Sequence, residues 1–179
     1  DVAPSRGLGD VYKRQMLIPS NHPLASVNDS YNAVFVNGDA VENAMFYGRG
    51  AGELPTASAV VGDLFDIARN ISAGCCGRIG CTCYKEIPVK KMADTHNRYF
   101  MRLIVEDRCG VLAEMTAVFA KYGVSVAQII QKAAREAGSA EVVVITAKVR
   151  EGDFRTAMEE LSGRESVRKI SSMLRVYGE

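Results

Sequence analysis

The stretch FMRLIVEDRCGVLAEMTAVFAKYGVSVAQIIQ, residues 100–131, decides the fold of the second half of the chain. Residues 100–105 form an apolar run typical of a buried strand, and a turn follows at Asp107–Gly110. From Val111 to Tyr122 apolar residues recur at helical spacing, and Gly123 stands where a C-terminal helix cap is expected. Residues 124–131, VSVAQIIQ, are expected to form another strand, so the stretch predicts a strand, a helix and a second strand.

The residues that follow complete a regular pattern. They predict a turn at 136–139, a third strand over 141–149, a second helix opening at 151–153 and a fourth strand over 167–177. The order βαββαβ within residues 98–179, with right-handed crossovers, gives a four-stranded antiparallel sheet with both helices on one face. This is a ferredoxin-like sandwich. Its open face or edge has to be covered, by side-by-side dimerisation or by docking on a larger body.

The first half of the chain predicts less structure. Residues 31–36 are expected to form a strand with Ala33 and Phe35 on one face and Val34 and Val36 on the other. Asn37-Gly38-Asp39 is a strong tight-turn signal and residues 41–48 return, so a β-hairpin is expected. A helix is expected over 55–70, with Pro55 at its first position. Its apolar stripe consists of Ala57, Val60, Val61, Leu64, Ile67 and Ala68. The expected fold class is therefore α+β, with a hairpin and a helix preceding the ferredoxin-like domain.

Composition sets limits on function. Apolar residues make up 47% of the chain, charged residues 24%, and the net charge is +1, so bulk electrostatics favour neither nucleic acid nor an anionic membrane as a partner. No apolar run approaches the roughly 20 residues that span a bilayer. Five cysteines, an odd number, and the lack of an export signal indicate a reducing compartment, so a cytoplasmic location is expected.

The glycine-rich stretch GRGAGELPTASAVVGD, residues 48–63, predicts a strand, a turn and a helix. Its spacing is GxGxG, whereas the dinucleotide fingerprint of a βαβ unit is GxGxxG. No strand ending in an acidic residue follows the predicted helix. The stretch is therefore not predicted to be a Rossmann phosphate loop.

Cysteines and other reactive side chains offer several readings. Cys75, Cys76, Cys81 and Cys83 could form a zinc site, but adjacent and one-apart cysteines pinch the tetrahedral geometry that C-x2–4-C spacing allows. Incidental thiols in a hinge are favoured, redox sensing remains open because Arg78 and Lys85 are near, and no metal is expected. His22 is predicted to be structural or exposed. A solvated helix face is favoured over a cation site for Asp63 and Asp66.

Residues 102–131 resemble an ACT domain, a small regulatory module that binds amino acids. Asp107, Gly110, Val111 and Leu112 match the family pattern Asp-x-Pro-Gly-Val-Leu, and Cys109 stands where the family has proline. The resemblance implies that backbone N–H groups at a helix N-terminus hold the ligand carboxylate while Asp107 takes the ammonium. The side chains expected beside them on the second strand are Ser125, Gln128 and Gln131, with Ser125 and Gln131 on one face because their spacing is even.

Residues 22–70, HPLASVNDSYNAVFVNGDAVENAMFYGRGAGELPTASAVVGDLFDIARN, resemble the end of the catalytic region of homoserine dehydrogenase. With the linker GRIGCTCYKEIP and the ACT domain, the resemblance covers residues 16–179. It implies that Gly50, Gly52, Glu53 and Thr56 lie near NAD(P), with Gly50 and Gly52 letting the cofactor approach the backbone. For Glu53, contact with ribose and capping of the following helix remain equally open.

The resemblance divides the chain into four segments. Residues 1–15 are expected to be disordered or foreign, 16–70 to be a catalytic-domain fragment, 71–97 a cysteine-containing linker and 98–179 the ACT domain. The family's N-terminal Rossmann domain and catalytic lysine find no counterpart here. No catalytic residue is therefore assigned, and the chain alone is expected to be inactive and to hold no cofactor.

In the intact family the reaction is hydride transfer between L-homoserine and L-aspartate 4-semialdehyde with NAD(P), in threonine and methionine biosynthesis. The expected effector is L-threonine or another amino acid. A homodimer through the ACT and hairpin strands is also expected. The alternative is a stand-alone amino-acid-binding ACT module that acts on a partner protein.

Overall fold

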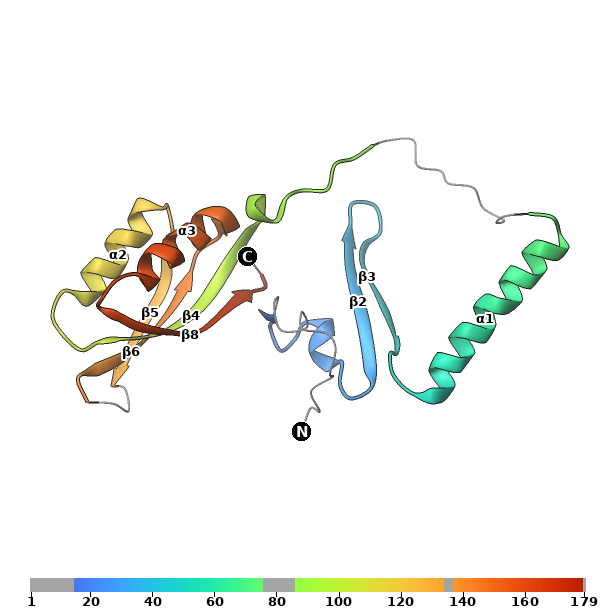
Figure 1. Ribbon diagram of the computed structural model, residues 1–179, viewed down its shortest axis with the longest axis horizontal. Helices are drawn as coiled ribbons and strands as arrows, with labels where there is room; N and C mark the ends of the chain where they lie inside the picture. Colours follow the sequence, from blue (N-terminus) through green and yellow to red (C-terminus); the bar gives the residue numbers. More distant parts are fainter. Residues whose placement is uncertain (1–14, 76–85, 134–136, 179) are drawn as a thin grey trace. The chain divides into compact units, whose positions relative to one another are not determined.

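The computed structural model describes residues 15–75, 86–133 and 137–178. The chain divides into two compact units, one comprising Ser20–Pro88 and the other Val89–Glu179 together with the start of the chain up to Pro19 (Figure 1). Residues 1–14, expected to be disordered or foreign, lie outside the described residues, and so do Cys76, Cys81 and Cys83, expected to be incidental thiols.

The C-terminal unit is built on four antiparallel strands in the order β8-β4-β6-β5. Its main elements are β4 (His96–Glu106), α2 (Val111–Lys121), β5 (Val126–Ala133), β6 (Ser139–Thr146), α3 (Glu151–Ser162) and β8 (Val167–Val176). Both helices lie on the same face of the sheet (Figure 1). The ferredoxin-like prediction is therefore confirmed, with element bounds that move by a few residues.

Three short elements complete this unit. The strand β1 (Met16–Leu17) runs parallel to the end of β8, so these two residues pair here although the sequence places them with the hairpin segment. The 3-10 helix η2 (Met92–Asp94) precedes β4. The strand β7 (Val149–Arg150) pairs with the first residues of β4, so the third strand expected over 141–149 is divided in two.

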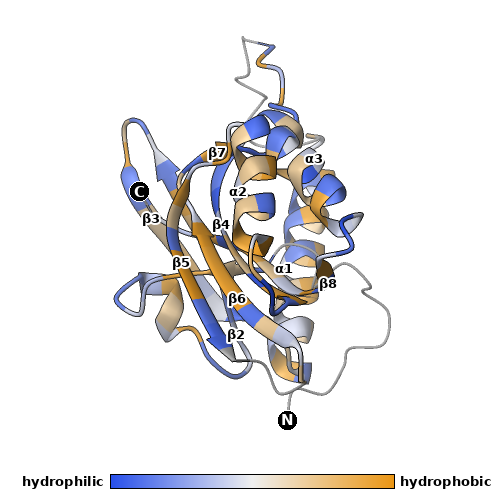
Figure 2. Cartoon of the chain, turned by 90° about the vertical axis from the view of Figure 1, so that its left-hand side faces the viewer, coloured by the Kyte–Doolittle hydropathy of each residue, from blue (hydrophilic) through white to orange (hydrophobic). Residues whose placement is uncertain are grey.

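The core lies between the sheet and the two helices. Alternate residues of β4 point into it, because successive side chains of a strand face opposite sides; they are Tyr99, Met101, Leu103 and Val105. Val142 and Val144 of β6 are buried in the same core. Much of this strand has the colour of hydrophobic residues in Figure 2. The helices contribute Val111, Met115, Val118, Phe119, Phe154, Ala157, Met158 and Leu161.

An ion cluster at the surface ties α2 to α3. The Glu160 carboxylate lies 2.6 Å from Nζ of Lys121 and 2.6 Å from Nη2 of Arg164, and it accepts a 2.8 Å hydrogen bond from the Tyr122 hydroxyl. Hydrogen bonds from Lys121, Tyr122 and Arg164 lower the pKa of Glu160 to about 2. The carboxylate is therefore ionised throughout the neutral range, and the two helices stay linked beside the core.

The other unit contains the predicted hairpin and helix. β2 (Tyr31–Gly38) pairs with β3 (Glu42–Arg49) in register from Tyr31–Arg49 to Gly38–Glu42, and α1 (Glu53–Ser72) follows. A 3-10 helix η1 (Pro23–Ser26) precedes the hairpin. Nδ1 of His22 accepts a 3.1 Å hydrogen bond from the Leu24 N–H, and its ring contacts Phe35 edge-on, which is a structural role.

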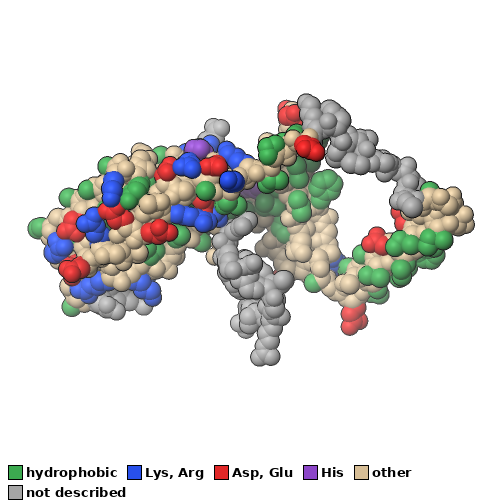
Figure 3. All heavy atoms as spheres, turned by 45° about the horizontal axis from the view of Figure 1, so that its top comes forward, with side chains coloured by type: hydrophobic (Ala, Val, Ile, Leu, Met, Phe, Trp, Pro, Cys, Tyr) green, Lys and Arg blue, Asp and Glu red, His purple; other side chains and the backbone are tan. Residues whose placement is uncertain are grey.

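Helix α1 starts earlier than expected. Gly52 has φ +126°, a value open to glycine, and acts as N-cap, so the helix begins at Glu53 and Pro55 is its third residue rather than its first. None of the helix residues is buried. Hydrophobic side chains gather along this helix in Figure 3, whereas acidic and basic side chains are interspersed over the C-terminal unit.

In the described part of the chain no helix is both long and apolar enough to cross a bilayer.

Substitutions of one leucine in each unit test which apolar residues stabilise this chain. Leu103→Ala should lower the free energy of unfolding by about 2–5 kcal/mol, because Leu103 is fully buried and leaves a cavity. Leu64→Ala on α1 should change it by less than about 0.5 kcal/mol, because Leu64 is 58% exposed. Urea denaturation followed by near-UV circular dichroism measures both. Equal losses for the two variants would contradict this picture of the core.

Candidate functional site

The loop between β4 and α2 forms a hollow at one end of the C-terminal unit. β4 ends at Glu106, and Gly110 has φ +93° as the N-cap of α2, a left-handed conformation that favours glycine. The hollow has a volume of about 420 Å³. It is lined by residues 105–112 and by Gln131 of β5. The sequence-predicted residues Asp107, Gly110, Val111, Leu112 and Gln131 are thus brought together.

The hollow offers hydrogen-bond donors from the backbone. The first intrahelical bond runs from the Glu114 N–H to the Gly110 carbonyl, so the N–H groups of Val111 and Leu112 have no acceptor within the helix. The positive end of the helix dipole adds to their attraction for an anion. The exposed carboxylate of Asp107 lines the same hollow. Anion donors and a carboxylate side by side suit a zwitterion.

Arg108 braces the loop, a role the sequence analysis missed. Its Nε lies 2.9 Å from a Glu106 carboxylate oxygen, and its Nη2 lies 3.1 Å from one of Glu114. Glu106 and Glu114 raise the pKa of Arg108 further above its ordinary value. These exposed pairs span the loop that Cys109 occupies in place of the family's proline, so side-chain contacts supply part of the restraint that proline would give.

A bulge in β5 separates the three polar residues expected on the second strand. Ser125 precedes the strand, and the register shifts between Val126 and Gln128, which inserts one residue. The predicted common face of Ser125 and Gln131 is therefore wrong, since the alternation changes phase between them. Gln131 pairs with buried Val142 and lines the hollow, whereas neither Gln128 nor Ser125 does so.

The residues expected near a cofactor lie in the other unit, at the start of α1. Gly52, Glu53 and Thr56 line an open, mainly apolar depression together with the first two turns of the helix. The Thr56 N–H donates to the Gly52 carbonyl at 3.1 Å, so the preceding N–H groups of the helix have no acceptor within it. These free donors at a helix N-terminus suit a phosphate or another anion.

The contact of Gly50 with a neighbouring strand restricts the size of the residue at this position. A Cβ at this position would lie 1.7 Å from Nδ2 of Asn32, so a larger residue would displace that side chain. The Gly50 N–H also donates to the Ser30 carbonyl at 3.0 Å. Gly50 does not line the depression that holds the other three residues. Packing within the hairpin thus accounts for this glycine.

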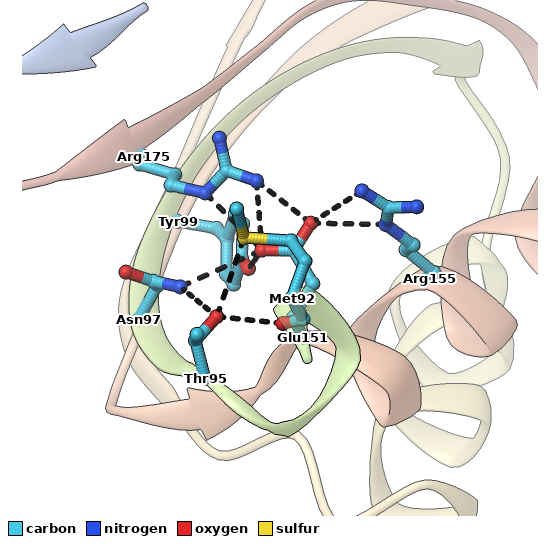
Figure 4. Close-up of polar contacts among 7 residues, drawn as sticks. All are labelled: Met92, Thr95, Asn97, Tyr99, Glu151, Arg155 and Arg175. Carbon is cyan, nitrogen blue, oxygen red and sulfur yellow. Dashed lines mark hydrogen bonds and ion pairs between the residues drawn. The ribbon is translucent and has the colours of Figure 1, made fainter. Parts of the chain in front are cut away.

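A second polar centre surrounds Glu151, the first residue of α3 (Figure 4). Glu151 is only 3% exposed. Its carboxylate accepts a 2.5 Å hydrogen bond from the Tyr99 hydroxyl and pairs with Arg175 and Arg155, each at 2.8 Å. Only the i,i+4 spacing of Glu151 and Arg155 was visible in the sequence. Tyr99 on β4 and Arg175 on β8 are paired across neighbouring strands but lie 52 and 24 residues from Glu151 in the sequence, so no local pattern marks them.

The contacts within this cluster determine the protonation states of Glu151 and Tyr99. Burial by itself would raise the pKa of Glu151, but hydrogen bonds from Tyr99, Arg175 and Arg155 outweigh it and hold that pKa below its ordinary value. Burial and the neighbouring Glu151 carboxylate raise the pKa of Tyr99 to about 12. The tyrosine is therefore the proton donor and the glutamate the ionised acceptor.

Within the described residues no three His, Cys, Asp or Glu side chains are grouped so as to hold a metal ion. Cys75 is a partly exposed thiol 3.7 Å from Oδ1 of Asn70, and Cys109 is an exposed thiol in the loop.

Two family models match the chain, homoserine dehydrogenase over residues 10–65 and the ACT domain over residues 99–165. The chain belongs to the homoserine dehydrogenase family. It is 42% identical over 161 residues to the homoserine dehydrogenase of Corynebacterium glutamicum and 42% identical over 165 residues to that of Synechocystis, with 89% of the chain covered in each case. It spans only 35% and 38% of those two proteins.

Solved structures of homoserine dehydrogenases are also similar to the chain. The homoserine dehydrogenase from Thiobacillus denitrificans superimposes with a TM-score of 0.74 at 30% identity, covering 89% of this chain and 37% of that one. The Staphylococcus aureus enzyme at pH 7.0 gives a TM-score of 0.50 at 27% identity, covering 92% of this chain and 37% of that one. The resemblance seen in the sequence is confirmed.

The buried glutamate predicts a loss of stability in acid. Because the folded pKa of Glu151 is lowered, its contribution is fully present above its unfolded pKa of about 4.3 and disappears as the pH falls through the folded pKa. Glu151→Gln should remove this dependence and cost about 3–5 kcal/mol at pH 7, because two guanidinium groups lose their partner. Urea midpoints between pH 7 and pH 3 measure both effects.

Glu141→Gln is the matched control. Glu141 pairs with Arg102 on the surface at 3.0 Å, so its loss should cost less than about 1 kcal/mol. A Glu151→Gln variant as stable as this control would show that the buried cluster does not stabilise the fold.

Proposed function

We propose that this chain is the effector-binding part of an NAD(P)-dependent homoserine dehydrogenase. The longer protein would transfer a hydride between L-homoserine and L-aspartate 4-semialdehyde, as the family does. The family assignment and the extent of the relatives beyond this chain support the proposal. So does the exposed apolar surface of α1, where Leu54, Phe65 and Ile71 are 83%, 61% and 74% exposed. Such a surface favours packing against a further catalytic body over a stand-alone module.

The hollow at 105–112 is the proposed effector site, and the free N–H groups at the start of α2 are the observation that carries it. They would bind the carboxylate of an amino acid, and Asp107 would bind its ammonium group. Gln131 would hydrogen-bond the hydroxyl of L-threonine, the effector we propose. A polar partner for the hydroxyl would favour L-threonine over an analogue that lacks it, because that hydrogen bond is then lost.

Threonine binding would regulate the enzyme by shifting its population of conformations. An effector changes activity only as far as it binds one conformation better than another. The loop begins where β4 ends, and β4 is the strand that receives the linker through η2. Occupancy of the loop would therefore act on the strand directly connected to the preceding unit.

The start of α1 is the proposed cofactor contact. Gly52, Glu53 and Thr56 would face NAD(P), which supplies or accepts the hydride when bound. The positive end of the helix and the free N–H groups of its first turn would attract a phosphate of the cofactor. Gly50 would act through the hairpin packing that positions this turn.

Threonine titration tests the effector site. Isothermal titration of L-threonine into the chain should show saturable binding, and L-valine, which has the same shape without the hydroxyl, should bind more weakly. Gln131→Ala should weaken threonine binding about three- to tenfold, as expected for one neutral hydrogen bond worth about 0.5–1.5 kcal/mol. Gln128→Ala is the control, because Gln128 does not line the hollow.

Two results would contradict the assignment. Threonine binding that is equally sensitive to both glutamine variants would place the ligand elsewhere. No binding to a folded chain would remove the effector role from this loop.

We further propose a homodimer formed through β5 and the hairpin. β5 ends the described sheet, and Ile129 and Ile130 on it are 40% and 49% exposed. On the hairpin, Val34 opposes Phe46, and they are 62% and 68% exposed on one face. A second copy would cover both surfaces.

Charged substitutions on these strands test the dimer. Sedimentation equilibrium should give a dimer for the unmodified chain, and Ile130→Lys or Phe46→Lys should weaken it at least about tenfold, because each places a charge at a buried contact. Asp39→Lys, at the hairpin turn, adds the same residue outside the proposed contact and should leave the dimer intact. A monomer at all concentrations would refute the proposal.

A further inference from the structure

A cavity of about 430 Å³ lies between α3 and β8, and no function is assigned to it. It shares no lining residue with the hollow at 105–112. Tyr99 lines the cavity and Val105 lines the hollow, so about 20 Å of strand β4 separates them at about 3.3 Å per residue. The cavity is therefore distinct from the proposed effector site.

Most of its wall is apolar. Phe154 and Met158 line it from α3, and three residues line it from β8, namely Ile170, Met173 and Leu174. Phe154 and Met158 are buried in the core, whereas Met173 is 48% exposed. A wall of this composition suits a branched or linear aliphatic chain.

Charged side chains of both signs line the cavity, with Glu159 among them. Arg155, Arg175 and Glu151 line it together, so two guanidinium groups share a single carboxylate (Figure 4). Both arginines use Nε and Nη2 on Glu151. Nη1 of each has no hydrogen-bond acceptor among the described residues. The Arg175 side chain is only 14% exposed, so its unused donor has little access to water.

An unused donor with little access to water favours a hydrogen-bond acceptor at the site, and a carboxylate is a strong acceptor for guanidinium groups. We propose that this cavity binds a small carboxylic acid with an apolar side chain. The carboxylate lies between Arg155 and Arg175, accepting hydrogen bonds from the two Nη1 groups, and the side chain lies against the apolar wall. Two sources share this chemistry, a branched-chain 2-oxo acid and an apolar amino acid. Glu159, which also lines the cavity, would favour the ammonium group of the latter.

The test uses the whole chain and two probes. We expect 4-methyl-2-oxopentanoate to bind saturably by calorimetry and to shift the backbone amide signals of 154–162 and 170–175 in NMR spectra, leaving those of 107–112 unchanged. L-Leucine is the second arm, and tighter binding of L-leucine would assign the site to an amino acid. The neutral 4-methylpentan-1-ol has a similar apolar chain and should bind at least tenfold more weakly than the acid.

Two variants locate the binding. Arg155→Gln should weaken binding of the acid about tenfold, equivalent to about 1.4 kcal/mol. Arg164→Gln should leave it unchanged, although Arg164 is likewise an exposed arginine paired with the glutamate four residues before it. Met173→Asp should also weaken binding at least tenfold, since it places a negative charge on the wall, and Met173 is exposed enough for the chain to stay folded.

Several results would overturn the proposal. They are an absence of binding of both acids at millimolar concentration, equal binding of the alcohol, or equal effects of Arg155→Gln and Arg164→Gln in folded variants. Amide shifts confined to 107–112 would assign the acids to the effector site instead.

Discussion

The buried carboxylate of Glu151 is the constraint on which the C-terminal unit depends. It begins α3, yet its contacts reach Tyr99 on β4 and Arg175 on β8, and its own N–H donates to the Thr95 carbonyl at 2.8 Å. An ionised carboxylate with 3% exposure is tolerable only when its hydrogen bonds are satisfied. The position of α3 over the sheet is thus set by charge pairing as well as by packing of Phe154 and Leu161.

The local patterns of the sequence were enough for the order of elements. Alternation in β4 and helical spacing in α2 are set by residues close together in the chain, so the βαββαβ order could be predicted. The Glu151 cluster could not, because its partners lie 52 and 24 residues away. The bulge in β5 was equally invisible. The bulge is seen only in the pairing of β5 with β6. It changes the alternation along β5, and Gln131 lines the hollow whereas Ser125 and Gln128 do not.

In the unit formed by Ser20–Pro88, the sequence predicted the elements but not which of their surfaces are buried. The hairpin and α1 were predicted from turn chemistry and periodicity, and both form. Their apolar faces nevertheless stay exposed, so periodicity alone did not indicate which surfaces are buried. Gly50 illustrates the same limit in the site. The sequence suggested a close approach of a cofactor, whereas the contact present is with Asn32, a residue of the neighbouring strand.

Strand β4 connects three features of this unit, namely the loop before α2, the Glu151 cluster and η2. Its end at Glu106 opens into the loop with the free N–H groups, and Tyr99 near its start belongs to the Glu151 cluster. Immediately before it, Asp94 of η2 is held by Arg150 at 3.0 Å, one residue from Glu151. β4 is hydrogen-bonded to β6 on one side and to β8 on the other, so a displacement of this strand would involve both neighbours. A signal from the loop to the preceding unit would therefore pass along β4 and through the contacts that fix Glu151 and Arg150.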